Sequence, residues 1–226
     1  MIDFEHVYKT YETHNDENVA LEDINIHIDE GEFVFILGHS GAGKSTFLKL
    51  IQMEEKPTEG KVFINGQDLT RIKRRKVPYL RRQMGVVFQD FRLIPTMTVY
   101  ENVAFAMRVT NISTKKIKDR VPFALSLVGL EDKMDRLPDE LSGGQKKRVA
   151  IAGVLAMNPK ILILDEPTRG IDIGTKTEIQ KLVLKLADEG KSLIFIPLRS
   201  RKCSVPATVW QFSVTVRRLE RLMRQI

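Results

Sequence analysis

The sequence has almost no cysteine or tryptophan and lacks any long apolar segment. Cys203 is the only cysteine among 226 residues, so no disulfide can form within one chain, and this composition fits a reducing cytosol. The longest apolar runs, such as 33–37 and 161–164, are far shorter than the roughly 20 residues of a membrane-spanning helix. Met1 leads into the strand-like stretch 2–7 rather than a signal peptide. We therefore expect a cytoplasmic protein, peripheral on the inner face of the cell membrane through a partner or a surface contact.

Histidine and charge are unevenly placed along the chain. The four histidines, His6, His14, His27 and His39, all precede residue 40. Residues 199–226 carry most of the net charge of +7, and a second basic run covers 71–76. Basic runs of this kind are most often solvated surface. Attraction to anionic lipid headgroups is the second interpretation, and binding of nucleic acid is the least favoured.

A glycine-rich loop follows the apolar run 33–37. Residues 38–45 read Gly-His-Ser-Gly-Ala-Gly-Lys-Ser, the pattern G-x-x-x-x-G-K-[ST], and a helix is predicted over 46–53. Such a loop points successive backbone N–H groups at phosphate oxygens, and the helix adds its positive N-terminal end. Lys44 is expected to reach the β- and γ-phosphates, and Ser45 to ligate Mg²⁺. The predicted nucleotide-binding residues here are Gly38, His39, Ser40, Gly41, Ala42, Gly43, Lys44, Ser45 and Thr46.

A second apolar run ends in two acids. Residues 161–164 are short enough for a buried parallel strand, and Asp165 and Glu166 follow. The carboxyl end of such a strand is where open α/β sheets bind ligands. Asp165 is expected to hold Mg²⁺. Glu166 is expected to face the other way and to orient or deprotonate an attacking water. The two motifs together predict hydrolysis of a nucleoside triphosphate.

A third motif precedes this acidic strand. Leu141, Ser142, Gly143, Gly144 and Gln145 stand before a stretch predicted to be helical over 146–157. Ser142 can cap that helix, and the glycines let an anion approach the backbone. With the other two motifs, this pattern resembles the signature sequence of the ATP-binding cassette (ABC) ATPases. The resemblance covers roughly residues 1–196.

The resemblance implies further roles. Tyr11 matches an aromatic residue that stacks on adenine, although a half-buried strand residue is the alternative. Gln89 matches the glutamine that contacts Mg²⁺ and the attacking water, so Glu166, Gln89 and Lys44 are the implied catalytic residues, and Ser45, Gln89 and Asp165 the implied metal ligands. Residues 170–172 match a loop that crosses to a second subunit. In the family two copies sandwich ATP, which implies a homodimer whose second copy contributes Ser142, Gly143, Gly144 and Gln145.

Different segments resemble different branches of the family. Residues 78–82, 86–93 and 98–104 are most similar to the FtsE branch, whose members act in bacterial cell division with the integral membrane protein FtsX. Residues 162–174 are instead similar to sugar-importer cassettes, and Gly153 stands where most members have arginine. Three functions stay open: a cell-division subunit, the energising subunit of an importer, with sugars as one candidate cargo, and a regulator that only binds ATP.

The family's switch histidine is missing. Counting from Glu166 places it at Leu198, and leucine cannot donate a hydrogen bond to phosphate. Loss of one positioned donor costs on the order of 10²- to 10³-fold in turnover, so we expect weak hydrolysis with nucleotide binding intact. The helix and strand that the resemblance implies beyond this point are not evident. Residues 209–216 alternate only in part, and 217–225 suit a short helix.

The patterns predict one α/β domain with a phosphate-loop NTPase (RecA-like) core, an antiparallel β-subdomain and an inserted helical subdomain. The core is expected over about 1–88 and 158–198, the helical subdomain over about 91–157 and an atypical basic tail over 199–226. Helices are predicted over 99–109 and 115–128, and strands at 2–7 and around 24–28. Four apolar residues are predicted either to contact a membrane partner or to pack internally: Phe91, Leu93, Ile94 and Pro95.

Overall fold

The fold is taken from a computed structural model, which describes residues 1–12, 17–39, 41–88, 90, 92–197 and the backbone of 210–213. An antiparallel sheet occupies one end, with strand order β2-β1-β4-β5. Its strands are β1 (Ile2–Glu12), β2 (Glu17–Ile28), β4 (Glu59–Ile64) and β5 (Gln67–Asp68). The predicted strands at 2–7 and 24–28 are therefore present, but both are longer than their alternating patterns suggested. Irregular register between β1 and β2 explains this, because a bulge interrupts the alternation without ending the strand.

A second, five-stranded sheet forms the centre of the molecule, with the order β6-β7-β8-β3-β9. Its strands are β3 (Phe33–Leu37), β6 (Met84–Val87), β7 (Ile161–Asp165), β8 (Ser192–Ile196) and β9 (Trp210–Ser213). The first four in this order are parallel, whereas β9 lies antiparallel to β3. Strand β9 lies within residues 209–216, whose alternation in the sequence is only partial.

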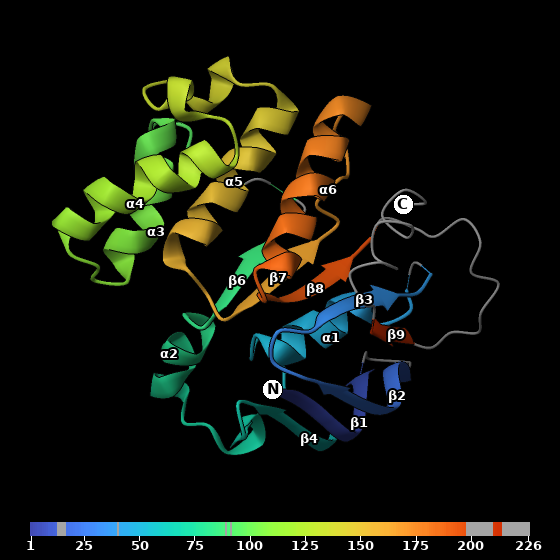
Figure 1. The fold of residues 1–226 in the computed structure, drawn as a ribbon. Helices are drawn as coiled ribbons and strands as arrows, with labels where there is room; N and C mark the ends of the chain where they lie inside the picture. The colour runs from blue at the N-terminus through green and yellow to red at the C-terminus, as the bar shows by residue number, and fades with distance from the viewer. Residues whose placement is uncertain (13–16, 40, 89, 91, 198–209, 214–226) are drawn as a thin grey trace.

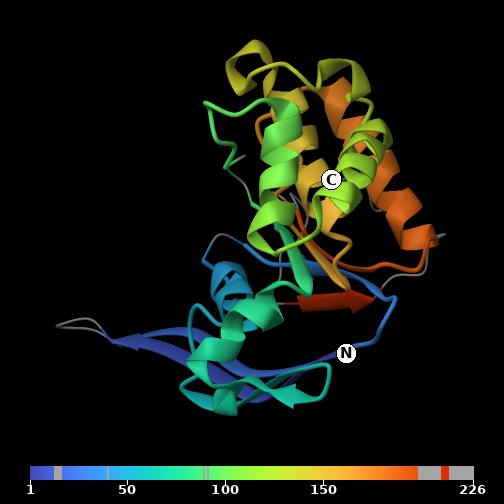
Figure 2. The same ribbon diagram turned by 90° about the vertical axis from the view of Figure 1, so that its left-hand side faces the viewer.

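Most of the helices lie on one side of the central sheet. Helices α3 (Val99–Val109), α4 (Thr114–Leu127) and α5 (Gly143–Met157) gather at the end opposite β1, β2 and β4, as Figures 1 and 2 show. The remaining helices are α1 (Lys44–Ile51), α2 (Val77–Arg81) and α6 (Ile173–Asp188), and short 3₁₀ turns cover Leu69–Arg71, Arg74–Lys76, Glu131–Lys133 and Pro138–Glu140. Among the described residues, no helix has the length and apolar character needed to cross a bilayer.

The helix predictions were close. Helix α3 has the predicted bounds, and α4 begins one residue early and continues through Pro122. Helix α5 begins at Gly143 rather than at 146, because Ser142 caps it as expected. The Gln145 N–H donates to Ser142 Oγ over 3.2 Å, and the Ser142 N–H donates to Gln145 Oε1 over 2.9 Å. This reciprocal pair fixes where the helix starts.

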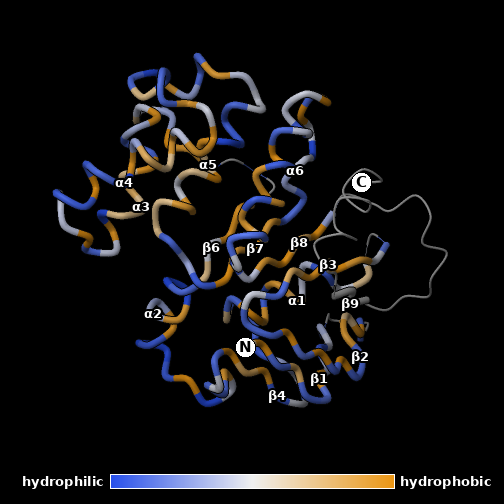
Figure 3. The backbone as a smooth tube through the Cα atoms, in the orientation of Figure 1, coloured by the Kyte–Doolittle hydropathy of each residue, from blue (hydrophilic) through white to orange (hydrophobic). Residues whose placement is uncertain are grey.

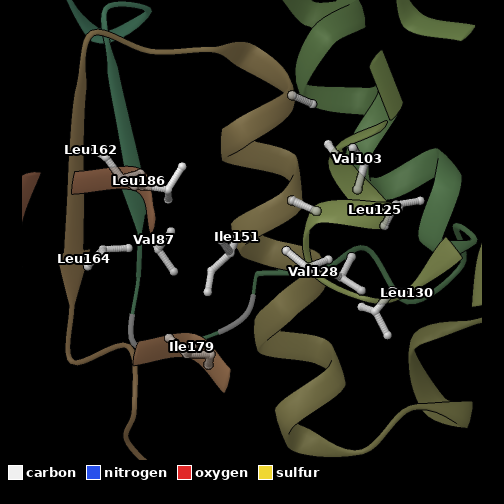
Figure 4. Close-up of a cluster of buried hydrophobic side chains, with 14 of the residues drawn as sticks. Val87, Val103, Leu125, Val128, Leu130, Ile151, Leu162, Leu164, Ile179 and Leu186 are labelled. Atoms are coloured by element: carbon white, nitrogen blue, oxygen red, sulfur yellow. The ribbon is translucent and has the colours of Figure 1, made fainter. Parts of the chain in front are cut away.

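Two hydrophobic clusters cover the two faces of the central sheet. On one face, Val34 and Ile36 pack with α1 and the antiparallel sheet, where Phe4 stacks on Phe47 with ring centroids 4.6 Å apart. On the other face, strands β6 and β7 pack against α3 to α6 (Figure 4). The hydropathy colouring shows that the four parallel strands of this sheet, β3, β6, β7 and β8, are largely apolar (Figure 3). The cluster runs without a break from the sheet into α3 to α5, and the division into subdomains stays a prediction.

Candidate nucleotide-binding site

The glycine-rich loop connects β3 to α1 and lies against β2. Gly43 is the N-cap of α1 and has the left-handed φ of 83°, a conformation that favours glycine. A Cβ atom at this position would lie 2.4 Å from the Ala20 carbonyl oxygen and 2.6 Å from Leu21 Cδ2. Glycine is therefore required here both for the backbone turn and for the close approach of β2.

The N-terminus of α1 differs from those of α3, α5 and α6 in its capping. In the part of the chain that the structure describes, no side chain caps α1, and the first turn of this helix contains no acid. The side chains of Thr98, Ser142 and Asp172, in contrast, cap α3, α5 and α6. The first N–H groups of a helix need acceptors, and an anion supplies them together with a favourable interaction with the helix dipole.

The Lys44 ammonium bends back across the loop. It donates to the Gly38 carbonyl oxygen over 2.6 Å and to the His39 carbonyl oxygen over 2.9 Å. Partial burial lowers the pKa of Lys44, and the nearby carboxylates of Glu166 and Asp165 oppose this shift. A positive charge is thus held between the loop and the two acids.

Asp165 and Glu166 lie where β7 ends. Burial raises the pKa of the Asp165 carboxyl and the neighbouring Glu166 raises it further, whereas Lys147 and Lys44 lower it. Glu166 has a φ of 45°, which is uncommon outside glycine. Its N–H donates to the Ile196 carbonyl oxygen in β8 over 2.9 Å. Because of this turn, Glu166 lines a pocket beside the loop.

That pocket has a volume of about 500 Å³, within the range of small-molecule sites. It brings together predicted residues from three separate segments: the end of β1, the glycine-rich loop with the start of α1, and the turn after β7. The residues that line it are Tyr11, Asn18, Ala20, Gly41, Gly43, Lys44, Ser45, Thr46, Glu166 and Arg169. The geometry places these side chains around one cavity, and their individual roles stay predictions.

Tyr11 combines features of both interpretations made from the sequence. It lines the pocket and is partly buried. The ammonium groups of Lys9 and Lys49 lie 4.9 Å and 5.9 Å from its ring centroid. Its hydroxyl is buried and has no hydrogen-bond partner among the described atoms. An adenine stacked on this ring would share it with these two cations.

The signature residues do not line this pocket. Ser142 uses its oxygen to cap α5, which leaves the hydroxyl proton able to donate. Gly144 packs against α6, since a Cβ there would lie 2.5 Å from Thr175 Oγ1. Within one chain, therefore, the signature residues do not contribute to the pocket beside the glycine-rich loop. The site residues Ser40, Gln89, Phe91 and Leu198 lie outside the described residues, as do the predicted helix at 217–225 and the rest of the basic tail apart from 210–213.

Two charged residues were missed at the sequence level. Arg169 lines the pocket and its Nη1 lies 2.9 Å from Glu166 Oε2. Lys147 is fully buried and donates to the Phe88 carbonyl oxygen over 2.9 Å. Burial lowers the pKa of Lys147, and Asp165, Asp90 and Glu166 oppose that shift. Arg169 had a signal, because it follows Glu166 by three residues in a turn-forming Pro-Thr-Arg-Gly sequence, but no pattern indicated Lys147.

The sequence and the structure of this chain were each found to be similar to known proteins. The family model described as ABC transporter matches residues 21–169. The cell division ATP-binding protein FtsE of Bacillus subtilis is 46% identical over 194 residues, which is 86% of this chain and 84% of FtsE. The methionine import ATP-binding protein MetN 1 of Bacillus thuringiensis is 43% identical over 189 residues, 84% of this chain but 56% of MetN 1. Among solved structures, the dimeric ATP-binding cassette MJ0796 in a post-hydrolysis state bound to ADP and Pi matches with a TM-score of 0.80 and 38% identity, covering 88% of each chain.

Proposed function

The chain belongs to the ABC transporter family and is one of its ATPases, and we propose that it is an FtsE-like subunit that works as a pair of copies with an integral membrane partner. The observation that carries the proposal is the shared pocket, where an uncapped helix N-terminus, Lys44 and Glu166 surround one cavity. The similarity to FtsE over most of both chains favours a role in bacterial cell division.

In this proposal ATP binds with its phosphates against the glycine-rich loop. The backbone N–H groups of residues 41–46 and the Lys44 ammonium contact the phosphates, and Tyr11 meets the adenine. Lys44 then exchanges the carbonyl oxygens that it contacts in this structure for phosphate oxygens. The two nearby acids keep the Lys44 ammonium charged. The phosphates of ATP therefore bind beside a positive charge that is already in place.

The donors present also fit Mg²⁺. The ion prefers oxygen ligands and usually takes one or two protein groups with the remainder from phosphate and water. Ser45 offers a hydroxyl, and Asp165 a carboxylate whose charged form is disfavoured by burial and would be stabilised by a divalent cation. We propose these two residues as ligands, with Gln89 as a third. When bound, the ion neutralises charge on the phosphates.

Glu166 is proposed as the residue that receives the proton of the attacking water. The water oxygen forms a bond to the γ-phosphorus while the bond from phosphorus to the bridging oxygen breaks. ADP leaves, and the proton passes from Glu166 to the product phosphate. The backbone of Glu166, fixed by its hydrogen bond to Ile196 in β8, holds the carboxylate at the pocket wall.

The second copy completes the site. In the proposed homodimer, Ser142, Gly143, Gly144 and Gln145 of one chain face the γ-phosphate in the other. Two observations support this: the signature residues do not line the pocket of their own chain, and the matched MJ0796 structure is dimeric. ATP then bridges the two copies, and hydrolysis separates them.

A groove between β6, α2, α3 and α5 is the proposed contact for the membrane partner. It has a volume of about 590 Å³ and is mostly apolar. Leu93 and Ile94, two of the four predicted contact residues, line it, as does Gly153. Arg81, Arg82 and Arg92 also line the groove. We propose that a helical segment of the membrane partner, apolar on one side and acidic at its end, occupies this groove. We propose contact between the basic run 71–76 and anionic lipids as a secondary interaction. Together these contacts place the chain peripherally on the inner face of the membrane.

An importer role is the second candidate. Residues 162–174 resemble sugar-importer cassettes, and MetN 1 is 43% identical. Purification of the tagged chain from gently solubilised membranes, followed by identification of the integral protein bound to it, separates the two functions. An FtsX-like protein supports the cell-division role, and a permease that carries a substrate-binding protein supports the importer role.

Two variants test the ATPase proposal itself. Lys44→Ala should abolish binding of Mg-ATP in equilibrium dialysis, and unchanged affinity would contradict the assignment of the pocket. Glu166→Gln should accumulate an ATP-bound dimer, visible as an earlier elution volume in gel filtration with Mg-ATP but not with ADP. A Glu166→Gln chain that remains monomeric would contradict the proposed pairing.

A further inference from the structure

We propose that Arg169 is a positioning residue that fixes the carboxylate of Glu166 for proton transfer. The inference rests on the proposed role of Glu166 and adds a residue to it. The guanidinium Nη1 of Arg169 lies 2.9 Å from Glu166 Oε2. Both side chains line the same pocket as Lys44 and Ser45. The contact therefore involves the reacting end of the proposed base and not a distant surface.

The backbone around this ion pair is fixed at three points. The Glu166 N–H donates to the Ile196 carbonyl oxygen over 2.9 Å, and the Arg169 N–H donates to the Glu166 carbonyl oxygen over 3.1 Å. Pro167 restricts its own φ within the turn. The left-handed φ of 45° at Glu166 persists because these contacts determine it. The main chain thus aims the Glu166 side chain, and its outer torsions are left for a side-chain partner to fix.

Arg169 is suited to that task. Its guanidinium is planar and remains charged, and one donor group contacts a single carboxylate oxygen. The pair uses Oε2 and leaves the other oxygen able to accept a proton from water. Glu166 is 19% exposed and Arg169 is 49% exposed, so the carboxylate is partly withdrawn from solvent while the guanidinium spans the pocket edge. Lys44 contacts the carbonyls of its own loop, whereas Arg169 contacts the Glu166 carboxylate directly.

The experiment compares Arg169→Ala and Arg169→Lys with the wild type. Partly exposed ion pairs contribute little to stability, but small misplacement of a reacting group is costly. Arg169→Ala should therefore lower kcat by roughly five- to tenfold and leave KM for ATP unchanged within about twofold. Arg169→Lys should recover part of the loss, because it restores a cation without the planar geometry.

A matched control removes an equivalent pair elsewhere. Arg136 and Glu140 form an ion pair of 2.7 Å on the surface, outside the pocket. Arg136→Ala should leave kcat and KM unchanged. If it lowers kcat as much as Arg169→Ala does, then the effect is general and the positioning role is wrong.

A second experiment, made in the Glu166→Gln variant, tests whether Arg169 positions Glu166 or binds phosphate directly. In Glu166→Gln, the additional change Arg169→Ala should not alter the affinity for Mg-ATP or the fraction of ATP-bound dimer. A weaker dimer in the double variant would identify Arg169 as a phosphate ligand and overturn the proposal. If Glu166→Gln traps the dimer but Arg169→Ala hydrolyses ATP as fast as the wild type, then the positioning role of Arg169 is wrong while the proposed role of Glu166 stands. A wild-type chain that binds ATP without turnover would overturn both the hydrolytic role of Glu166 and the support from Arg169.

Discussion

Replacing Gly144 by alanine tests whether this signature glycine serves the fold as well as the nucleotide. A Cβ at Gly144 would lie 2.5 Å from Thr175 Oγ1, 2.6 Å from its Cγ2 and 2.9 Å from its Cβ. Thr175 cannot easily move aside, because its Oγ1 donates to Asp172 Oδ2 over 2.7 Å and its N–H donates to Asp172 Oδ1 over 2.9 Å. The start of α5 and the start of α6 would have to separate.

The magnitude follows from overpacking. An inserted group in a close contact costs about 1–3 kcal/mol, and Gly144 is near the helix start, where alanine gains little in return. For a chain of this length each kcal/mol lowers Tm by about 2–4 °C. We therefore expect Gly144→Ala to lower the Tm of the nucleotide-free protein by roughly 2–12 °C, measured by thermal unfolding with circular dichroism.

The same helix provides a control of opposite sign. At Gly153, the nearest atom to an added Cβ is Val103 Cα at 4.0 Å, so an alanine fits. Gly153→Ala should stabilise the chain by about 0.5–1 kcal/mol through helix propensity. Adding Thr175→Ala to Gly144→Ala removes the two nearest atoms and should restore part of the loss. Equal stability of Gly144→Ala and the wild type, or equal losses at both glycines, would refute the packing argument.

Three further substitutions test the charges of the site. Asp165→Asn should stabilise the nucleotide-free chain at neutral pH. The pKa of Asp165 is raised in the folded state, so the wild type loses stability as pH rises from the unfolded-state pKa toward the folded-state pKa. Over that pH range, urea unfolding should show a growing difference in the free energy of unfolding in favour of the variant. Lys147→Met should change the pH dependence of stability at alkaline pH. Burial lowers the pKa of Lys147, so wild-type stability relative to the variant should rise as pH increases from the folded-state pKa toward the unfolded value of about 10.4, measured by urea unfolding. Parallel stability curves for the two chains would mean that the pKa of Lys147 is the same in the folded and unfolded states. Leu198→His should raise ATP turnover by up to about 10²-fold in a coupled phosphate-release assay, and no change would place the switch position elsewhere.

Much of the site could be predicted because its signals are local. A strand, a glycine loop and a helix follow one another within residues 33–51, and the acids come directly after β7. Since parallel strands present their carboxyl ends at one edge, the loop after β3 and the acids after β7 had to meet. The bounds of α3 were predicted because Thr98 and Glu101 form a capping box at its start and its buried positions follow a helical period.

The residues that were missed depend on contacts that no local pattern contains. Charged side chains are almost never fully buried unless paired, so Lys147 would be assigned to a solvated face of α5. It is buried because its ammonium donates a hydrogen bond to the Phe88 carbonyl oxygen and because carboxylates from separate segments, Asp90 and Asp165, oppose the cost of burying its charge. Strand β9 was obscure for a related reason: its residues pair with residues of β3 that lie 173 to 179 positions earlier in the chain, and pairing of that kind leaves little trace in the periodicity of either strand.

The case of Arg169 is more instructive, because its partner is only three residues away. Arginine three positions after glutamate is a common spacing, and in a helix it would place both side chains on one face in solvent. Here the intervening turn is set by a hydrogen bond from Glu166 to Ile196 in β8, thirty residues along the chain. That long-range bond directs Glu166 into the pocket, and only then does the local pair lie beside the phosphate loop. A short-range sequence feature therefore acquires its chemistry from a distant strand, and disrupting the end of β8 should release Glu166 and Arg169 together.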